Sequence, residues 1–347
     1  MYNKNKIIKK NSLLSKNEST AIKGVVMLLI VLGHINLLGT YTDMDGVTRW
    51  YSWWRIMYKC HVFVFFILPF IYGSKDLDTK GIYKHAKRDF IRMYVPYIWF
   101  FIICFLIFLC MGGDNDMLVV LHAFIVGGSQ PLLEAAVNVR FLWFMPVMAI
   151  LLLWRNLWFN KITFKGKVIV SAISFCMAGM GGVMLEPILN KIPFSIGYVF
   201  IYMWSSILSR FILDRFKDFN RWYTMGVFIS LALLYIFLGG IGYDTILNFV
   251  IQICLPTSFF LLLFSIRKWI AKFNFIKSFG MLSFQIYLIH LFIYQALVML
   301  CKYYDVDTTL FLLWGGIQYI ITLIVSYYMA RFIQNNKIVN RLLFCTN

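Results

Sequence analysis

The stretch Ile22–Gly39, IKGVVMLLIVLGHINLLG, is apolar enough for a membrane-spanning helix and contains two ionisable residues, Lys23 and His34. At 100° and 1.5 Å per residue, their side chains would lie on nearly the same helix face, roughly 16 Å apart. We therefore predict a cation at the mouth of this helix and an imidazole in its interior, near mid-depth in the bilayer. An ionisable residue at that depth costs free energy, which favours a functional role. A buried neutral histidine bonded to a neighbouring helix fits the same pattern.

The composition excludes an ordinary soluble domain. Of the 347 residues, 61% are hydrophobic and 14% are charged, and the mean hydropathy is +0.75. These values and the recurring apolar runs predict an all-α fold, a polytopic transmembrane helical bundle of about ten spans. The spans are expected at about 24–41, 56–73, 91–112, 140–155, 167–185, 193–209, 223–239, 245–266, 279–300 and 310–332.

The formal net charge of +18 follows this topology. If the N-terminus is inside, the inner segments carry most of the 33 Lys and Arg residues and fewer than half of the 15 Asp and Glu residues. That distribution obeys the positive-inside rule and, with ten spans, predicts that both termini are cytosolic. Because the charges are divided among short loops and tails, we expect membrane lipids as partners and no nucleic acid.

We expect a single membrane domain, 24–332, between a basic cytosolic tail at 1–23 and a second cytosolic tail at 333–347. No internal repeat, linker or low-complexity segment divides the chain, and the polar N-terminal segment lacks the apolar core of a signal peptide. The seven cysteines are spread singly without a CxxC motif. They therefore predict neither a disulfide framework nor a metal site.

A stripe of cations precedes the third span. Lys84, Arg88 and Arg92 recur every fourth residue on the helix that leads into this span, on the same predicted side of the membrane as Lys23. Like charges at this spacing repel each other. The stripe is therefore typical of a site for a polyanionic ligand, although interfacial cations also bind anionic lipid.

Other polar groups lie inside predicted spans: His61 in the second span, and Tyr287 and His290 on one face of the ninth. A cationic mouth on the cytosolic side, with histidines deeper in the bundle, suits group transfer. An acyl thioester of coenzyme A is a polyanion made in the cytosol. A neutral imidazole could deprotonate an acceptor hydroxyl or take the acyl group itself.

Five motifs resemble those of the integral-membrane acyltransferases of the acyltransferase-3 type, and together they cover nearly the whole chain. Lys23 and His34 keep the spacing of the family's opening Arg and His, with the Lys of the fucose 4-O-acetylase-like branch in place of Arg. The other motifs are His61 followed by VFVFFI, with Leu68 and Pro69 where the family has Ser-Gly; Arg88 and Arg92 followed by Pro96 and Tyr97; Leu142, Trp143 and Phe144; and Ser283, Tyr287 and His290.

The resemblance implies that the membrane domain is an O-acyltransferase of the bacterial cytoplasmic membrane. It would move an acetyl group from acetyl-CoA to a hydroxyl of a sugar or cell-envelope glycan, free or lipid-linked, without a permanently bound cofactor. By resemblance, His34 is catalytic, Lys23, Arg88 and Arg92 bind acetyl-CoA, and His61, Arg140, Trp143, Tyr287 and His290 bind substrate or support the site.

Two other functions would use the same features. A transporter or flippase of an anionic envelope precursor would bind its cargo through the cations and relay protons through His34, although the chain lacks the inverted repeat typical of transporters. A non-enzymatic assembly or sensor component would need a soluble module, and none is expected from this sequence.

Overall fold

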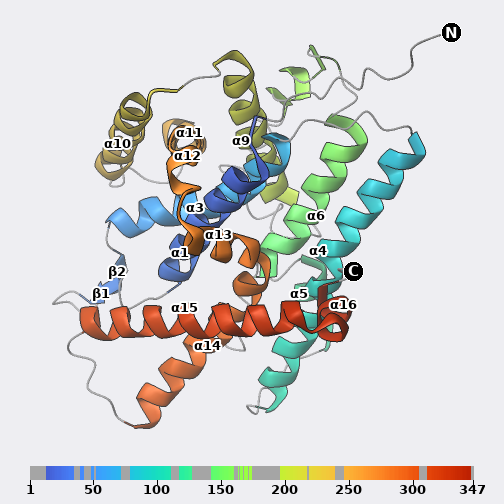
Figure 1. Cartoon of the computed structure of the whole chain (residues 1–347), viewed down its shortest axis with the longest axis vertical. Coiled ribbons are helices and arrows are strands. Elements are labelled where there is room, and N and C mark those ends of the chain that lie inside the picture. Colours follow the sequence, from blue (N-terminus) through green and yellow to red (C-terminus); the bar gives the residue numbers. More distant parts are fainter. Residues whose placement is uncertain are drawn as a thin grey trace.

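The computed structural model describes residues 13–34, 40–42, 48–50, 52–71, 79–110, 117–126, 142–159, 196–216, 219–238, 246–304 and 311–344, with isolated residues between 163 and 173. The helices shown in Figure 1 are α1 (Lys16–Gly33), α3 (Ser52–Ile71), α4 (Thr79–Cys110), α5 (Met117–Val126), α6 (Phe144–Trp154), the π-helix η3 (Arg155–Phe159), α9 (Ile196–Arg215), α10 (Arg221–Leu238), α11 (Ile246–Ser265), α12 (Arg267–Ile270), α13 (Asn274–Met281), α14 (Ser283–Tyr303), α15 (Phe311–Asn335) and α16 (Lys337–Phe344). One short antiparallel hairpin, β1 (Thr40–Thr42) and β2 (Thr48–Trp50), is added to the predicted all-α fold.

The described helices confirm the predicted helical membrane architecture. Lys80–Cys110 in α4, Ser283–Cys301 in α14 and Trp314–Asn335 in α15 are long and apolar enough to cross a bilayer. Shorter apolar helical stretches are Cys60–Ile71, Phe144–Leu157, Arg221–Phe237 and Ile253–Ser265. Each predicted span overlaps a described helix except 167–185, which lies largely outside the described residues. The count of ten spans, the domain bounds and the cytosolic location of both termini stay predictions.

Helix α1 lies at the centre of the bundle. A capping box fixes its start, because Ser15 Oγ accepts the backbone N–H of Glu18 at 3.2 Å while the Glu18 carboxylate accepts that of Ser15 at 2.8 Å. Ile22, Met27 and Ile30 are 0% exposed. The helix contacts α3, α12, α13, α14 and α15, with α10 and α11 to one side and α4 and α6 to the other (Figure 1). Packing along its whole length therefore holds α1 in place.

The expectation that His34 lies in the interior of this helix is wrong. Helix α1 ends at Gly33, and His34 is its C-cap. Gly33 accounts for part of the difference, since glycine propagates a helix poorly. The backbone N–H of His34 still donates to the carbonyl of Ile30 at 3.2 Å. The stretch from Lys23 to the cap is thus helical, and the expected rise of roughly 16 Å applies to it.

Two glycines let α1 and α13 approach backbone to backbone. A Cβ added at Gly24 would lie 2.0 Å from the carbonyl oxygen of Ile276, and one at Gly280 would lie 1.8 Å from that of Thr20. Neither position tolerates a side chain without movement of a main chain. Since α13 leads directly into α14, this contact also determines where the histidine of α14 stands relative to α1.

Donors from two other elements satisfy the C-terminal end of α3. The last carbonyls of a helix have no partner within it. Arg155 of η3 donates to the carbonyl of Pro69 at 2.8 Å, and Arg210 of α9 donates to that of Ile71 at 2.7 Å. Ser206 adds a buried hydrogen bond to the carbonyl of Phe66 at 3.1 Å. These bonds fix α3 relative to η3 and α9.

We expect Gly24→Ala to lower the apparent melting temperature of the detergent-purified protein. The added methyl group would meet a backbone carbonyl, and strain of this kind in a packed core costs about 1–3 kcal/mol. Gly226→Ala in α10 is the matched control, because a Cβ there meets nothing within 4 Å. The control should be stabilised by roughly 0.5–1 kcal/mol. Thermal unfolding followed by intrinsic fluorescence measures both, and Gly24→Ala melting at or above the wild-type temperature would contradict the close packing.

Candidate active site

Three histidines from three helices meet inside the bundle. His34 caps α1, His61 lies in α3 and His290 lies in α14. The ring centroid of His34 is 5.0 Å from that of His290 and 6.5 Å from that of His61. His61 and His290 are 0% exposed, and His34 is partly buried. Because the three are far apart along the chain, their contact is produced by the packing of α1 against α3 and α14.

The backbone determines which nitrogen of each ring carries a proton. In every ring Nδ1 lies against the carbonyl four residues earlier in the chain: Ile30 for His34 at 2.8 Å, Met57 for His61, and Ile286 for His290 at 3.0 Å. A carbonyl oxygen only accepts, so each neutral ring holds its proton on Nδ1. The Nε2 atom of each ring then carries the lone pair.

His34 and His290 also contact each other. His34 Nδ1 and His290 Nε2 are 3.3 Å apart. With the protons assigned as above, His34 donates its Nδ1–H both to the carbonyl of Ile30 and to His290. This arrangement orients the His34 ring and directs the lone pair of its Nε2 away from both partners, as a base or a nucleophile requires. Among the residues that the structure describes, no group of three or more His, Cys, Asp or Glu is arranged to hold a metal ion.

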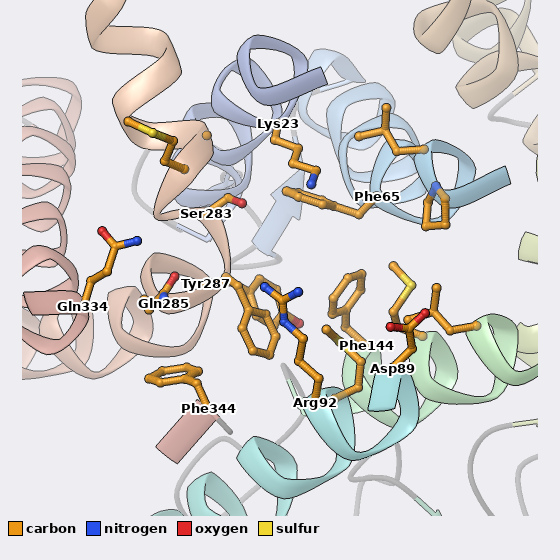
Figure 2. Close-up of a pocket in the computed structure, with 18 of the residues that line it drawn as sticks. Lys23, Phe65, Asp89, Arg92, Phe144, Ser283, Gln285, Tyr287, Gln334 and Phe344 are labelled. Atoms are coloured by element: carbon orange, nitrogen blue, oxygen red, sulfur yellow. The ribbon is translucent and has the colours of Figure 1, made fainter. Parts of the chain in front are cut away.

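A cavity of about 960 Å³ lies at the Lys23 side of the histidine cluster, beside the last turns of α3 and α15 and the first turns of α14 (Figure 2). Its walls come from α1, α3, α4, α6, η3, α13, α14, α15 and α16. Its volume is at the upper end of the range of roughly 300–1,000 Å³ typical of small-molecule sites. Its charged side chains are five cations, Lys23, Arg92, Arg155, Lys337 and Arg341, and one acid, Asp89.

Lys23 and Arg92 face the cavity from opposite walls. Figure 2 shows Lys23 descending from α1 and Arg92 rising from α4 into the same space. The positive charge of Arg92 acts repulsively on the ammonium group of Lys23. Within the described part of the chain, neither side chain forms an ion pair with a carboxylate. A ligand with several negative charges would relieve this repulsion.

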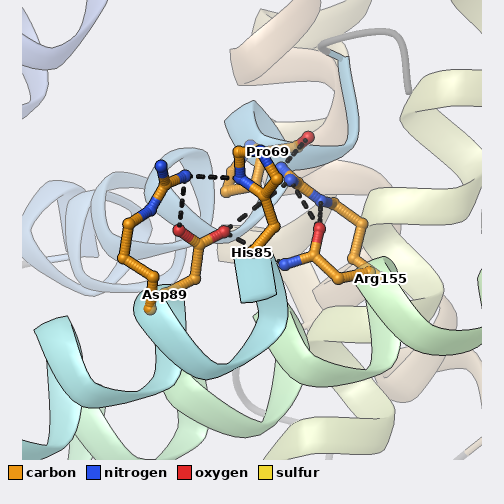
Figure 3. Close-up of polar contacts among 6 residues, drawn as sticks. Pro69, His85, Asp89 and Arg155 are labelled. Atoms are coloured by element: carbon orange, nitrogen blue, oxygen red, sulfur yellow. Dashed lines mark hydrogen bonds and ion pairs between the residues drawn. The ribbon is translucent and has the colours of Figure 1, made fainter. Parts of the chain in front are cut away.

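Asp89, the acid of the cavity, is already engaged by other groups (Figure 3). Its Oδ2 accepts the amide of Asn156 at 3.0 Å and lies 4.0 Å from Arg155 Nη2. Arg155 also donates to the carbonyl of Pro69 and to the amide oxygen of Asn156 at 2.8 Å. This network joins α3, α4 and η3 and neutralises the one negative charge of the wall. The remaining cations therefore give the cavity a positive potential.

Arg88 belongs to the same network but does not line the cavity. Its guanidinium lies 3.3 Å from the Asp89 carboxylate and 2.6 Å from Nδ1 of His85, and its side chain is 64% exposed. Of the two arginines in the predicted stripe, Arg92 thus faces the cavity and Arg88 faces the surface beside it. Arg88 makes no direct contact with the cavity that would support its predicted role in donor binding.

An aromatic layer separates the cavity from the histidines. Phe65, Phe144 and Tyr287 line the cavity, and the ring centroids lie 6.0 Å apart for Phe65 and Phe144 and 5.0 Å apart for Phe144 and Tyr287. The Tyr287 ring centroid is in turn 6.0 Å from that of His290. Cations, aromatic rings and imidazoles therefore follow one another from the cavity toward the histidine cluster.

The structure brings most of the predicted site residues together. Lys23, Arg92 and Tyr287 line the cavity, and His34, His61 and His290 form the cluster behind it. Trp143 packs against Phe66, with ring centroids 6.0 Å apart, and is not part of the cavity wall. Arg140 lies outside the described residues. The chemical role of each residue stays a prediction.

Four ionisable residues of the cavity were missed by the sequence-based prediction: Asp89, Arg155, Lys337 and Arg341. Arg155 is the last residue of the predicted span 140–155, and no role was predicted for it. Lys337 and Arg341 fall in the segment predicted to be a cytosolic tail. Their spacing of four residues was a usable signal, because it puts both side chains on one helix face.

A family model described as an acyltransferase domain matches residues 17–331. No curated protein and no solved structure matches the chain. The matched range contains all three histidines, Lys23, Arg92 and the aromatic layer. It confirms the family predicted from the motifs, whereas the fucose 4-O-acetylase-like branch stays a prediction. The chain therefore belongs to the acyltransferase-3 family of membrane acyltransferases.

Proposed function

We propose that the protein is an O-acyltransferase that moves an acetyl group from acetyl-CoA to a hydroxyl of a sugar or cell-envelope glycan in the bacterial cytoplasmic membrane. The observation that carries the proposal is the arrangement of a positively charged cavity, an aromatic layer and a histidine cluster in that order. A thioester donor has a matching order of groups: a polyanionic head, then a long uncharged arm, then the reactive thioester. Membership of the acyltransferase-3 family supports the reaction class.

The donor's phosphates would lie among the cavity cations. Lys23 and Arg92 face each other across the cavity without a carboxylate partner in the described part of the chain. Arginine and lysine donate charge-assisted hydrogen bonds to phosphate, and the forked guanidinium can do so with two parallel bonds. Arg88 would act at longer range, by balancing the charge of Asp89 beside the cavity.

The chemical step would take place at His34. Its Nε2 removes the proton of the acceptor hydroxyl as the oxygen attacks the thioester carbonyl. The C–S bond then breaks, the acetyl ester is formed, and the thiolate of coenzyme A takes the proton from the imidazolium. His290 would act as a positioning residue, because it accepts the His34 Nδ1–H at 3.3 Å and so fixes the ring and its tautomer.

Donor and acceptor would reach His34 from opposite ends of α1. The cationic cavity lies at the Lys23 end, and His34 follows the other end, roughly 16 Å away by helix rise. The interior between them is apolar, which excludes the water that would hydrolyse the thioester. The acetyl group would then cross part of the bilayer without a free intermediate.

We expect His34→Ala to reduce acetyl transfer at least about a hundredfold, the usual contribution of a positioned general base. The assay uses oriented vesicles with radiolabelled acetyl-CoA on the cytosolic side and envelope glycans, extracted from the host, trapped inside. Label should enter the trapped glycan with the wild type and not with the variant. Coenzyme A binding and the melting temperature should both be retained, which separates loss of chemistry from loss of fold.

Three results would contradict this proposal. Near wild-type transfer by His34→Ala would exclude the imidazole from the reaction. Product formed only when both substrates share the cytosolic side would exclude transfer across the membrane. Movement of unlabelled glycan across the membrane with no label transfer would instead favour a transporter or flippase.

His290 can be tested by two substitutions of different hydrogen-bonding capacity. We expect His290→Leu to lower kcat by up to about a hundredfold, because a misoriented base loses rate to this extent. His290→Gln should retain more activity, since its amide oxygen can accept the His34 Nδ1–H. KM for acetyl-CoA should change little in either variant. Equal kcat values in the two variants would show that His290 contributes only packing.

Arg92 should affect donor binding more than chemistry. We expect Arg92→Ala to raise KM for acetyl-CoA by about tenfold, since a hydrogen bond between charged groups contributes roughly 1.5–3 kcal/mol. Arg92→Lys should rescue in part, because the charge is kept and the fork is lost. Arg88→Ala should raise KM less than Arg92→Ala. A larger effect of Arg88→Ala would assign phosphate binding to the surface beside the cavity.

A further inference from the structure

The C-terminal helix α16 (Lys337–Phe344) follows the residues that the family model matches, which end at 331, yet it forms part of the cavity wall. It supplies Lys337, Asn340, Arg341 and Phe344 to that wall. At 100° per residue these four side chains fall within about one third of the helix circumference. One continuous face of α16 is therefore turned toward the cavity.

Specific contacts hold α16 in this position. The side-chain oxygen of Asn336 accepts the backbone N–H groups of Ile338 and Val339, both at 3.1 Å, and so caps the start of the helix. At the other end Phe344 is 1% exposed. Its ring centroid lies 6.4 Å from that of Phe100 in α4 and 5.7 Å from that of Phe284 in α14. The helix is thus capped at its start, and Phe344 anchors its other end between α4 and α14.

A second face of α16 is apolar and exposed. Ile338 is 80% exposed and Leu342 is 57% exposed, and their spacing of four residues puts them side by side. A short helix with an apolar face and a separate cationic face is typical of the membrane interface. With the apolar face toward the lipid, the cations of the other face are held over the cavity.

Lys337 and Arg341 have no ion pair within the described part of the chain. Two like charges four residues apart destabilise a helix slightly unless an anion lies between them. They join Lys23 and Arg92 around a cavity whose acid is engaged by Arg155 and Asn156. A ligand with phosphate groups at more than one point would contact both pairs of cations.

We propose that α16 is a phosphate-binding wall of the donor site, in which Lys337 and Arg341 bind phosphate groups of the coenzyme A moiety. This inference rests on the proposed function and adds to it two binding residues that lie outside the family's matched range. The four cations would surround the phosphates, so that α16 contributes to affinity for the donor and takes no part in the chemical step.

The test compares a double variant with two donors in vesicles of phosphatidylcholine, which carries no net charge. Lys337→Ala/Arg341→Ala should raise KM for acetyl-CoA by about tenfold. With S-acetylpantetheine, a thioester donor without phosphates, its kcat/KM should equal that of the wild type. Lys268→Ala/Lys272→Ala is the matched control, because it removes two cations at the same spacing outside the cavity wall. The control should leave KM for both donors unchanged.

The other outcomes distinguish failure of the α16 inference from failure of the acyltransferase proposal. Unchanged KM for acetyl-CoA in the α16 variant, with an active wild type, would overturn the inference and leave the acyltransferase proposal standing. An equal loss with both donors would assign α16 a structural role, and a loss that appears only when anionic lipid is added would assign its cations to lipid headgroups. Either result overturns the inference. A wild type that neither binds coenzyme A nor transfers acetyl would overturn both proposals.

Discussion

The burial of α1 is the constraint on which the rest of the site depends. Helix α1 contacts five other helices, and this packing holds Lys23 within the helix and His34 after its last residue at a fixed separation. The close backbone approach at Gly24 and Gly280 makes this packing specific, since it leaves no room for a side chain between α1 and α13. Because α13 leads into α14, the same contact determines the meeting of His34 with His290.

Several polar groups of the interior have the cost of their burial offset by partners close by. The imidazoles donate Nδ1–H to carbonyls of the preceding helical turn, which leaves their positions determined by backbone rather than by mobile partners. Asp89 accepts the amide of Asn156 and pairs with Arg155, and Arg155 in turn donates to the carbonyl of Pro69 in the last turn of α3. Among the described residues of the cavity wall, the charges without a carboxylate partner are those of Lys23, Arg92, Lys337 and Arg341, and these lie where a ligand can reach them.

Much of this could be predicted from the sequence, because helix periodicity and membrane thermodynamics are local properties. The separation of Lys23 and His34, the helical membrane fold and the cationic side of the cavity follow from them. The contact of the three histidines does not, since the pairing of distant helices depends on packing that a single sequence does not reveal. The separate orientations of Arg88 and Arg92 were missed because a stripe defines a helix face only to within a broad sector.

The cavity contacts of Lys337 and Arg341 were missed for a different reason. Lys337 and Arg341 were counted as topogenic charge because the positive-inside rule explains any cytosolic cation without asking what it contacts. The positive-inside rule takes no account of packing. In the structure Phe344 is buried between α4 and α14, and this contact holds the preceding turn of α16 over the cavity.

The separation of the cationic cavity from the histidine cluster suits a donor whose phosphates and thioester lie at opposite ends. Phosphate groups lose too much hydration to enter an apolar bundle, so they must stay among cations at its edge. In the proposed reaction the thioester and acetyl group, which are uncharged, would cross the aromatic layer of Phe65, Phe144 and Tyr287 at far lower cost. Binding energy gained by the phosphates at the cavity would then hold the reactive end near His34, where an apolar surround would keep water from competing with the acceptor hydroxyl.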